Sequence, residues 1–308
     1  MGWIFQPIFF MRTLLITNTY DQTSDLLVLK MGSENFIRIN FDRPQDWLIE
    51  FSPNDLKISS LHGEFTNSEI SKCFWRKPFI SEPKDGIFKD KFYVSEWKYL
   101  IYELSSFMEE QGKLRFNPPS PDYMLGKMKQ QRKAKNYFKI PKSNWSINVI
   151  PDTKNPCITK SMSASTFNDN SVLYTTEVSN KELSSDIWYL QELINAEYDL
   201  TIVHIYGLNF AFQLNRDNLT GIDWRKDQVD HVQHWIPYNL SPEFNFKINS
   251  FMNEMDLVYG RLDFMNDSSF EEPYFLEVNK NGQWAWLDPN FDNGLFIEMC
   301  KVIDPHKA

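Results

Sequence analysis

The segment from Arg261 to Trp286 constrains the fold of this chain more than any other. Its sequence, RLDFMNDSSFEEPYFLEVNKNGQWAW, predicts two short strands joined by a polar turn, the first from Arg261 to Phe264 and the second from Tyr274 to Asn279. Side chains alternate across a strand, so Glu277 and Asn279 share one face. If the strands pair as a hairpin, Asp263 meets Glu277 on that face.

Such a hairpin places two carboxylates and one amide oxygen around a common point. Two carboxylates held close together are costly unless a cation lies between them. Hard oxygen ligands suit Mg²⁺ and leave coordination positions for water and phosphate. The sequence therefore predicts a magnesium site formed by Asp263, Glu277 and Asn279, although an ordinary hairpin with an acidic face has the same alternation.

The order of these three residues resembles a known family pattern. An Asp on one strand followed by Glu-x-Asn on the next is similar to the metal triad of the ATP-grasp ligases. The continuation from Glu277 to Trp284 resembles the ATP-grasp enzymes that cyclise ribosomally made peptides, the microviridin or graspetide synthetases, including the grasp-with-spasm maturases. The resemblance implies an α/β (α+β) ATP-grasp fold. It divides the chain into an N-terminal α/β lobe (1–119), a central lobe (120–195) and a C-terminal lobe with antiparallel strands and the metal site (196–308).

Composition limits the classes of partner. With 308 residues, of which 42% are hydrophobic, the chain can bury a sizeable core. A net charge of −9 argues against wholesale nucleic-acid binding. No run approaches about eighteen apolar residues, so neither a transmembrane helix nor a membrane partner is predicted. Three scattered cysteines show no disulfide framework or zinc spacing, which predicts a reducing cytoplasm.

Two lysines are candidates for contacts with the phosphates of ATP. The pattern Lys127-x-x-Gln130-x-x-x-Ala134 resembles the segment in which ATP-grasp enzymes place such a lysine, and Lys129 is the neighbouring candidate. Most of the other basic residues in this segment are expected on a solvated helix face. The letters PCITK predict a strand that ends in Lys160 beside a small polar loop, from which a lysine can reach a phosphate. The resemblance implies that Lys160 contacts the α- and β-phosphates and is catalytic.

A predicted hinge between the lobes is the candidate nucleotide site. By resemblance, its residues bind the adenine and ribose of ATP; they are Gln191, Glu192, Leu193 and Ile194. One position departs from the family pattern, in which an arginine usually follows an acidic–Leu pair. This chain has Asp199-Leu200-Thr201, so another residue takes that role or the local geometry differs.

A second signature, Asp223-Trp224-Arg225, again resembles the peptide-cyclising subgroup. The planar fork of arginine can hold a γ-phosphate and the charge that develops as it transfers, so Arg225 is predicted to be catalytic. An Asp–Arg surface pair would look the same in sequence. No residues of suitable type lie at the spacing of third and fourth zinc ligands from His231 and His234, so zinc is not expected there.

Two helices are predicted from apolar residues at helical spacing. They run from Glu96 to Gly112 and from Phe246 to Leu257, and the second is expected to pack under the metal hairpin. Gly112 is expected to cap the first.

The function implied by the resemblance is macrocyclisation of a precursor peptide, leader plus core, with ATP and Mg²⁺. A substrate Asp or Glu becomes an acyl phosphate that a Ser or Thr hydroxyl attacks to give an ω-ester, or a Lys amine to give an amide. The leader is expected to bind a surface distinct from the ATP site, and the candidate is the hairpin from Gly207 to Asp223. A homodimer is a further candidate partner. Two alternatives stay open: a ligase that adds an amino acid to a peptide or protein tail, and a catalytically silent peptide-binding homologue.

Overall fold

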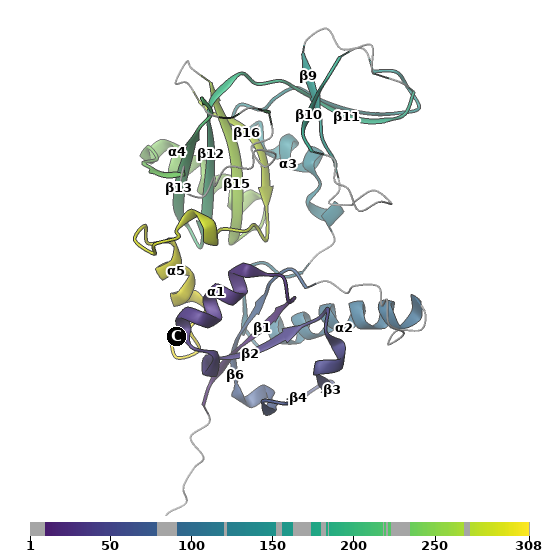
Figure 1. Ribbon diagram of the computed structural model, residues 1–308, viewed down its shortest axis with the longest axis vertical. Helices are drawn as coiled ribbons and strands as arrows, with labels where there is room; N and C mark the ends of the chain where they lie inside the picture. The colour runs from purple at the N-terminus through teal and green to yellow at the C-terminus, as the bar shows by residue number, and fades with distance from the viewer. Residues whose placement is uncertain are drawn as a thin grey trace, which may run out of the picture. The chain divides into compact units, whose positions relative to one another are not determined.

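The computed structural model describes residues 10–78, 91–119, 122–151, 156–162, 174–179, 183, 185–217, 219, 221–222, 235–267 and 272–307. The chain divides into two compact units (Figure 1). The first unit is Met1–Pro119 together with Gln283–Ala308, and the second is Ser120–Gly282. Helices with parallel and antiparallel sheets confirm the predicted mixed α/β class. The division into three lobes stays a prediction, and Gln283–Ala308 lies with the first unit rather than with the strands that precede it.

The first unit is built on a four-stranded parallel sheet in the order β2-β1-β6-β7. Its strands are β1 (Arg12–Thr17), β2 (Phe36–Asn40), β6 (Ile70–Trp75) and β7 (Leu114–Arg115). A small antiparallel sheet follows β2 and contains β3 (Leu48–Phe51), β4 (Leu56–Ser60) and β5 (Gly63–Thr66). The helices are α1 (Gln22–Met31), α2 (Lys91–Glu110) and α5 (Leu295–Ile303).

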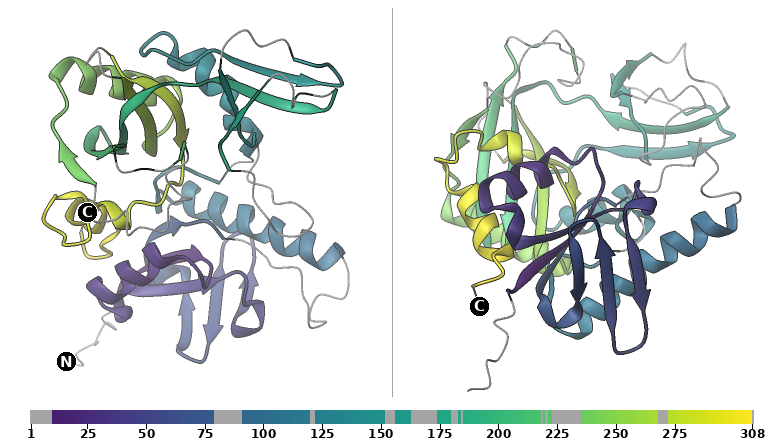
Figure 2. Two further views of the ribbon diagram at one scale, coloured as in Figure 1. Left: turned by 45° about the horizontal axis from the view of Figure 1, so that its top comes forward. Right: turned by 60° about the horizontal axis from the view of Figure 1, so that its bottom comes forward.

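The apolar face of α2 forms much of the core of the first unit. Ile101, Leu104 and Met108 recur at helical spacing and pack with Leu14 of β1 and other buried strand residues. Figure 2 shows this helix, in blue, running along the purple sheet. The helix starts five residues before the predicted Glu96 and ends, as predicted, before Gly112, whose φ of +67° suits a residue without a side chain.

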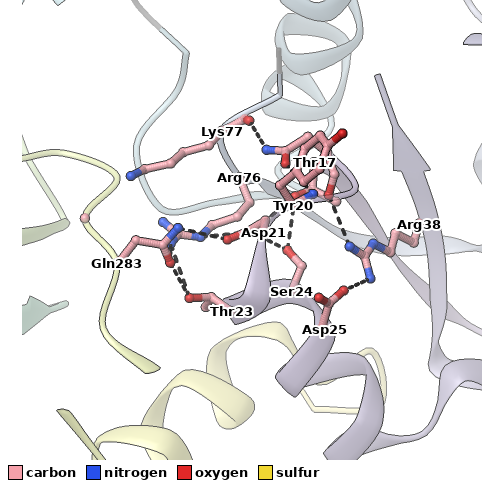
Figure 3. A network of polar contacts seen from close by, with 12 residues as sticks. Thr17, Tyr20, Asp21, Thr23, Ser24, Asp25, Arg38, Arg76, Lys77 and Gln283 are labelled. Carbon is pink, nitrogen blue, oxygen red and sulfur yellow. Dashed lines mark hydrogen bonds and ion pairs between the residues drawn. The ribbon is translucent and has the colours of Figure 1, made fainter. Parts of the chain in front are cut away.

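A buried ion pair holds the end of β6, the start of α1 and Gln283 together (Figure 3). Nε of Arg76 lies 3.3 Å from Oδ2 of Asp21, and neither residue is exposed by more than 2%. The Gln283 side chain donates to Asp21 Oδ1 at 3.2 Å and accepts from Arg76 Nη2 at 2.6 Å. A buried charge pair whose partners are both hydrogen-bonded avoids the cost of an isolated buried charge. The network therefore fixes Gln283 within the first unit.

The described residues of the second unit form two antiparallel sheets and two α-helices. The smaller sheet has the order β10-β9-β11-β8, with β8 (Ser143–Ile147), β9 (Cys157–Thr159), β10 (Thr176–Val178) and β11 (Ile187–Glu192). The larger has the order β14-β13-β12-β15-β16, with β12 (Ala196–Ile205), β13 (Leu208–Asn215), β14 (Ile236–Tyr238), β15 (Tyr259–Asp267) and β16 (Tyr274–Asn279). The helices are α3 (Lys127–Ala134) and α4 (Pro242–Glu254).

Helix α4 covers one face of the larger sheet (Figure 1). Its buried residues Ile248, Phe251 and Met252 pack with Leu262 of β15 and Phe275 of β16, which confirms the predicted packing under the hairpin. The helix begins four residues before the predicted Phe246 because Ser241 caps it, its side chain accepting from the N–H of Phe244 at 3.1 Å. The opposite face of β15 and β16 is left to the polar residues of the candidate site.

Within the described parts of the chain, no helix combines the length and the apolar character needed to cross a membrane.

Candidate active site

The hairpin predicted from the sequence is present as β15 and β16. The two strands are antiparallel, with Asp263 opposite Glu277 and Arg261 opposite Asn279. Residues that alternate along paired strands share a face, so these four polar side chains lie together. The structure therefore brings the three predicted metal ligands to one place.

A glutamine from α3 covers the outer edge of β16. Gln130 Nε2 donates to the carbonyl of Val278 at 3.1 Å, and Gln130 Oε1 accepts from the N–H of Val278 at 2.8 Å. Because β16 ends the sheet, these backbone groups have no strand partner on that side and need another one. Val278 lies between Glu277 and Asn279, so the two bonds fix the strand segment that carries both ligands.

The same face of α3 presents Lys127 to the carboxylates. Lys127 precedes Gln130 by three residues, which places the two side chains on one side of the helix. Its Nζ lies 3.1 Å from Glu277 Oε2 and donates to the carbonyl of Ser161 at 2.8 Å. Lys129 is exposed and donates to the carbonyl of Met124. Of the two candidate lysines, the structure brings Lys127 to the site.

The donor set fits a hard divalent cation. Asn279 Nδ2 donates to Asp263 Oδ2 at 3.2 Å and to Glu277 Oε1 at 3.3 Å, so a partial positive charge already lies between the carboxylates. The amide also has an oxygen of the kind that Mg²⁺ prefers. No three His, Cys, Asp or Glu side chains cluster for a metal anywhere among the described residues, which leaves two carboxylates and one amide as the donors here.

Glu277 is held in its charged form. Burial alone would raise the pKa of this carboxyl, but the charges of Lys127 and Lys160 and hydrogen bonds from Lys127 and Asn279 lower the pKa to about 2. The residue is therefore ionised throughout the neutral range, which is the state that a metal ligand requires.

Lys160 follows β9 and lies over an aromatic ring. Its Nζ is 5.9 Å from the centre of the Tyr189 ring. The Tyr189 hydroxyl accepts from Gln131 Nε2 at 3.1 Å and from Gln191 Nε2 at 3.3 Å, and burial raises the pKa of this phenol. Gln131 and Gln191 thus orient the ring of Tyr189, and Lys160 lies over this ring. The charge of Lys160 also acts on Glu277.

The four hinge candidates lie at the end of β11 and just after it. The amide of Gln191 is 2% exposed and also donates to Ser143 Oγ at 3.0 Å, so this side chain points into the interior. Glu192 is bound to the backbone of Lys142, and the N–H of Leu193 donates to Pro156 O at 3.2 Å. Ile194 accepts a backbone bond from Ala196 at 3.1 Å. The nucleotide roles of these residues stay proposals.

Solved structures similar to the whole chain identify the fold. An ATP-grasp ligase associated with RiPPs from Chryseobacterium gregarium, solved with ADP and a leader and core peptide, has a TM-score of 0.77 at 20% identity and covers 95% of this chain and 96% of its own. The macrocyclase MdnC from Microcystis aeruginosa MRC, bound with precursor peptide MdnA, has a TM-score of 0.75 at 20% identity, covering 95% and 99%. The chain has the ATP-grasp fold. D-alanine–D-alanine ligase from Bacillus anthracis, complexed with ATP, is similar at a TM-score of 0.54 and 12% identity, covering 96% of each chain. No protein-family model matches the sequence, and no curated protein matches it either.

Arg261 is a residue of this candidate site that sequence reasoning missed. Its Nε donates to Asp263 Oδ1 at 3.2 Å and its Nη2 to Oδ2 at 3.0 Å. Thr201 of β12, where the family pattern has an arginine, donates through Oγ1 to Asp263 Oδ1 at 2.7 Å. The signal in the sequence was the spacing of two between Arg261 and Asp263, which places them on one face of a strand.

The turn after Asn279 is packed closely against this part of the ATP-grasp fold. Gly282 N–H donates to Asn279 O at 3.0 Å, and the buried hydroxyl of Tyr259 donates to Gly282 O at 2.7 Å. A Cβ at position 282 would lie 2.5 Å from the Cβ of Arg261, so only glycine fits without movement. The predicted catalytic Arg225 lies outside the described residues, as do His231 and His234.

Proposed function

We propose that this protein is an ADP-forming ligase that macrocyclises a ribosomally made precursor peptide. The observation that carries the proposal is the cluster of Asp263, Glu277 and Asn279 with Lys127 in an ATP-grasp fold. Structures similar to it over nearly their whole length include a ligase solved with a leader and core peptide and a macrocyclase bound with a precursor peptide.

The roles of the residues follow from their charges. Asp263, Glu277 and Asn279 would hold Mg²⁺, which would supply neutralisation of phosphate charge there. Lys127 and Lys160 neutralise the remaining phosphate charge. Arg225 holds the γ-phosphate, and Gln191, Glu192, Leu193 and Ile194 bind the adenine and ribose. A cation held there would neutralise Glu277, the carboxylate that Lys127 pairs with in this structure, and Lys127 would then face the phosphates.

The reaction has two chemical steps. An oxygen of a substrate Asp or Glu carboxylate attacks the γ-phosphorus, the bond to the β-phosphate oxygen breaks, and ADP leaves with that electron pair. A Ser or Thr hydroxyl, or a Lys amine, of the same peptide then attacks the acyl carbon, loses its proton and expels inorganic phosphate. Activation is needed because a free carboxylate is a poor electrophile, and ring closure makes the second attack intramolecular.

The peptide substrate brings a leader and a core. The segment from Gly207 to Asp223 is the proposed leader-binding surface, and its described part includes β13, which pairs with β12 and β14. The cytoplasm remains the proposed compartment: the free cysteines Cys73 and Cys157 are buried and Cys300 is partly buried. A homodimer stays a prediction.

Mass spectrometry tests the function directly. Peptides that are encoded beside the gene and are rich in Thr and in Glu or Asp are incubated with the protein, ATP and Mg²⁺. Loss of the mass of one water per ring, with ADP and phosphate released, is the expected result. A mass gain equal to an added amino acid would support tail ligation. Binding of one peptide without any change in mass would support the silent homologue.

Helix α3 offers a matched pair of variants for the same assay. Lys127→Met is expected to abolish ring formation, because its ammonium reaches the carboxylate cluster. Lys129→Met, two residues away on the exposed side, is expected to retain it. Equal activity of the two variants would contradict the proposed site.

A further inference from the structure

The open edge of β8 differs from the other sheet edges that the structure describes. A strand at the edge of a sheet presents unpaired backbone N–H and C=O groups, which can pair with another chain. Proteins protect such edges with charged side chains, proline, very short strands or a covering residue. β8 ends the smaller sheet of the second unit, and among the described strands it pairs with β11 alone.

The seven other edges of the four described sheets all carry one of these protections. Gln130 covers β16, Pro237 lies within β14, and β7 is only two residues long. Each of the remaining four edge strands contains a charged residue: Arg38 in β2, Glu50 in β3, Glu64 in β5 and Glu177 in β10. β8 has none of these protections in its five residues.

The sequence of β8 and of the residues directly after it is uncharged. Positions 143–151, SNWSINVIP, contain no charged residue, although 24% of the whole chain is charged. Trp145 and Ile147 share one face of β8 and are 53% and 58% exposed. Ile187 of β11 lies opposite Ile147 and is 57% exposed. The edge therefore combines free backbone groups with an exposed apolar face.

We propose that β8 pairs with β8 of a second copy of this chain, antiparallel and about a two-fold axis, so that the two smaller sheets become one continuous sheet. This inference goes beyond the proposed ligase function and does not depend on it. The ladder of an antiparallel pair looks the same from both strands, so a strand can form it with its own copy. The exposed Trp145 and Ile147 of the two copies then meet on one face of the joined sheet.

The charges of this segment favour a second copy over a peptide as the occupant. In a two-fold pair each side chain faces a residue of the same segment, and like charges directly opposite each other destabilise a strand pair. The uncharged stretch 143–151 avoids that repulsion. A substrate peptide rich in Glu and Asp, in contrast, would find no cation along this stretch to pair with.

Sedimentation equilibrium of the full chain tests the pairing. Because a single shared strand edge makes a small interface, the wild type is expected to be a dimer only at about 10 to 100 µM. Trp145→Lys and Trp145→Glu each place like charges near the two-fold axis. Each variant alone is expected to halve the measured mass, from that of two chains to that of one. An equimolar mixture of the two is expected to restore the dimer, because Lys then faces Glu.

Leu48→Lys is the matched control. Leu48 is 72% exposed and lies on β3, an edge strand that Glu50 already protects. This variant is expected to dimerise like the wild type. Circular dichroism checks that every variant is folded. If the variants at Trp145 fail to fold, Ile147→Lys and Ile147→Glu provide the same test from the same exposed face.

Four results would overturn the proposal. A wild type that stays monomeric at about 100 µM would show that the β8 edges do not pair. Loss of precursor-peptide binding by Trp145→Lys, with a monomeric wild type, would assign the edge to the peptide. A dimer that both Trp145 variants retain would place the interface on another surface. Variants that are monomeric alone and stay monomeric when mixed would show that Trp145 does not meet its own counterpart.

Discussion

Glu277→Gln tests the electrostatics of the site and its chemistry in one variant. A carboxyl whose pKa falls from its ordinary value of 4.5 to about 2 favours its charged form in the folded state by about 3 kcal/mol at neutral pH. Glutamine has the same shape without the charge. We therefore expect the free energy of unfolding to fall by up to about 3 kcal/mol at pH 7 in the absence of Mg²⁺.

The dependence on pH follows from the sign of the shift. Because the folded pKa lies below the unfolded one, the stabilisation is complete above about pH 4.5 and is lost as the pH falls towards 2. The difference between wild type and variant is expected to shrink to about 1 to 1.5 kcal/mol near pH 3. Urea denaturation followed by circular dichroism, with EDTA present, measures both values.

A control variant and a second assay separate the loss of the Lys127–Glu277 pair from the general effect of removing a charge. Glu254 forms an exposed pair with Lys133 at 2.8 Å, so Glu254→Gln is expected to lose less stability than Glu277→Gln. With Mg²⁺ and ATP, Glu277→Gln is expected to release no ADP. A variant as stable as the wild type at both pH values would refute the charge cluster, and wild-type ADP release would refute the metal assignment.

Three further substitutions test the surroundings of the site. Gly282→Ala places a Cβ 2.5 Å from that of Arg261, so a loss of about 1 to 3 kcal/mol and of turnover is expected, and an unchanged melting temperature would contradict the close packing. Tyr259→Phe leaves the buried carbonyl of Gly282 without its hydroxyl donor, which is expected to cost about 1 to 3 kcal/mol by urea denaturation; no loss would show that another donor serves it. Arg76→Met leaves Asp21 buried and uncompensated, with an expected loss of about 3 to 5 kcal/mol. Adding Asp21→Asn should restore part of that stability, and additive losses from the two changes would argue against the pair.

The hairpin could be predicted from the sequence because its information is local. Alternation along β16 places Glu277 and Asn279 on one face whatever surrounds them, and this strand has the predicted bounds. The first strand is longer than predicted, because β15 runs from Tyr259 to Asp267 and includes Asp267, which was expected in the turn. The helices were predicted for the same reason, since apolar spacing in α2 and α4 is a property of consecutive residues. Their first residues were missed because helix starts depend on caps such as Ser241.

The choice between Lys127 and Lys129 was not available from the sequence. Both lie in one basic run, and either could face a phosphate. The structure distinguishes them because Gln130 binds both backbone groups of Val278, which sets the rotation of α3 about its axis. Once that rotation is fixed, Lys127 points at Glu277 and Lys129 at solvent.

The sequence by itself determined which chemical groups this protein brings to its candidate site: two carboxylates and an amide on a hairpin, and lysines near strand and helix ends. The tertiary structure alone decided which cations face which carboxylate. Arg261 and Thr201 are 60 positions apart, yet they meet at Asp263 because the register of β12 and β15 puts them there. Electrostatic pairing depends on distances of a few ångströms between strands, and those distances are set by sheet register and helix rotation rather than by neighbours along the chain.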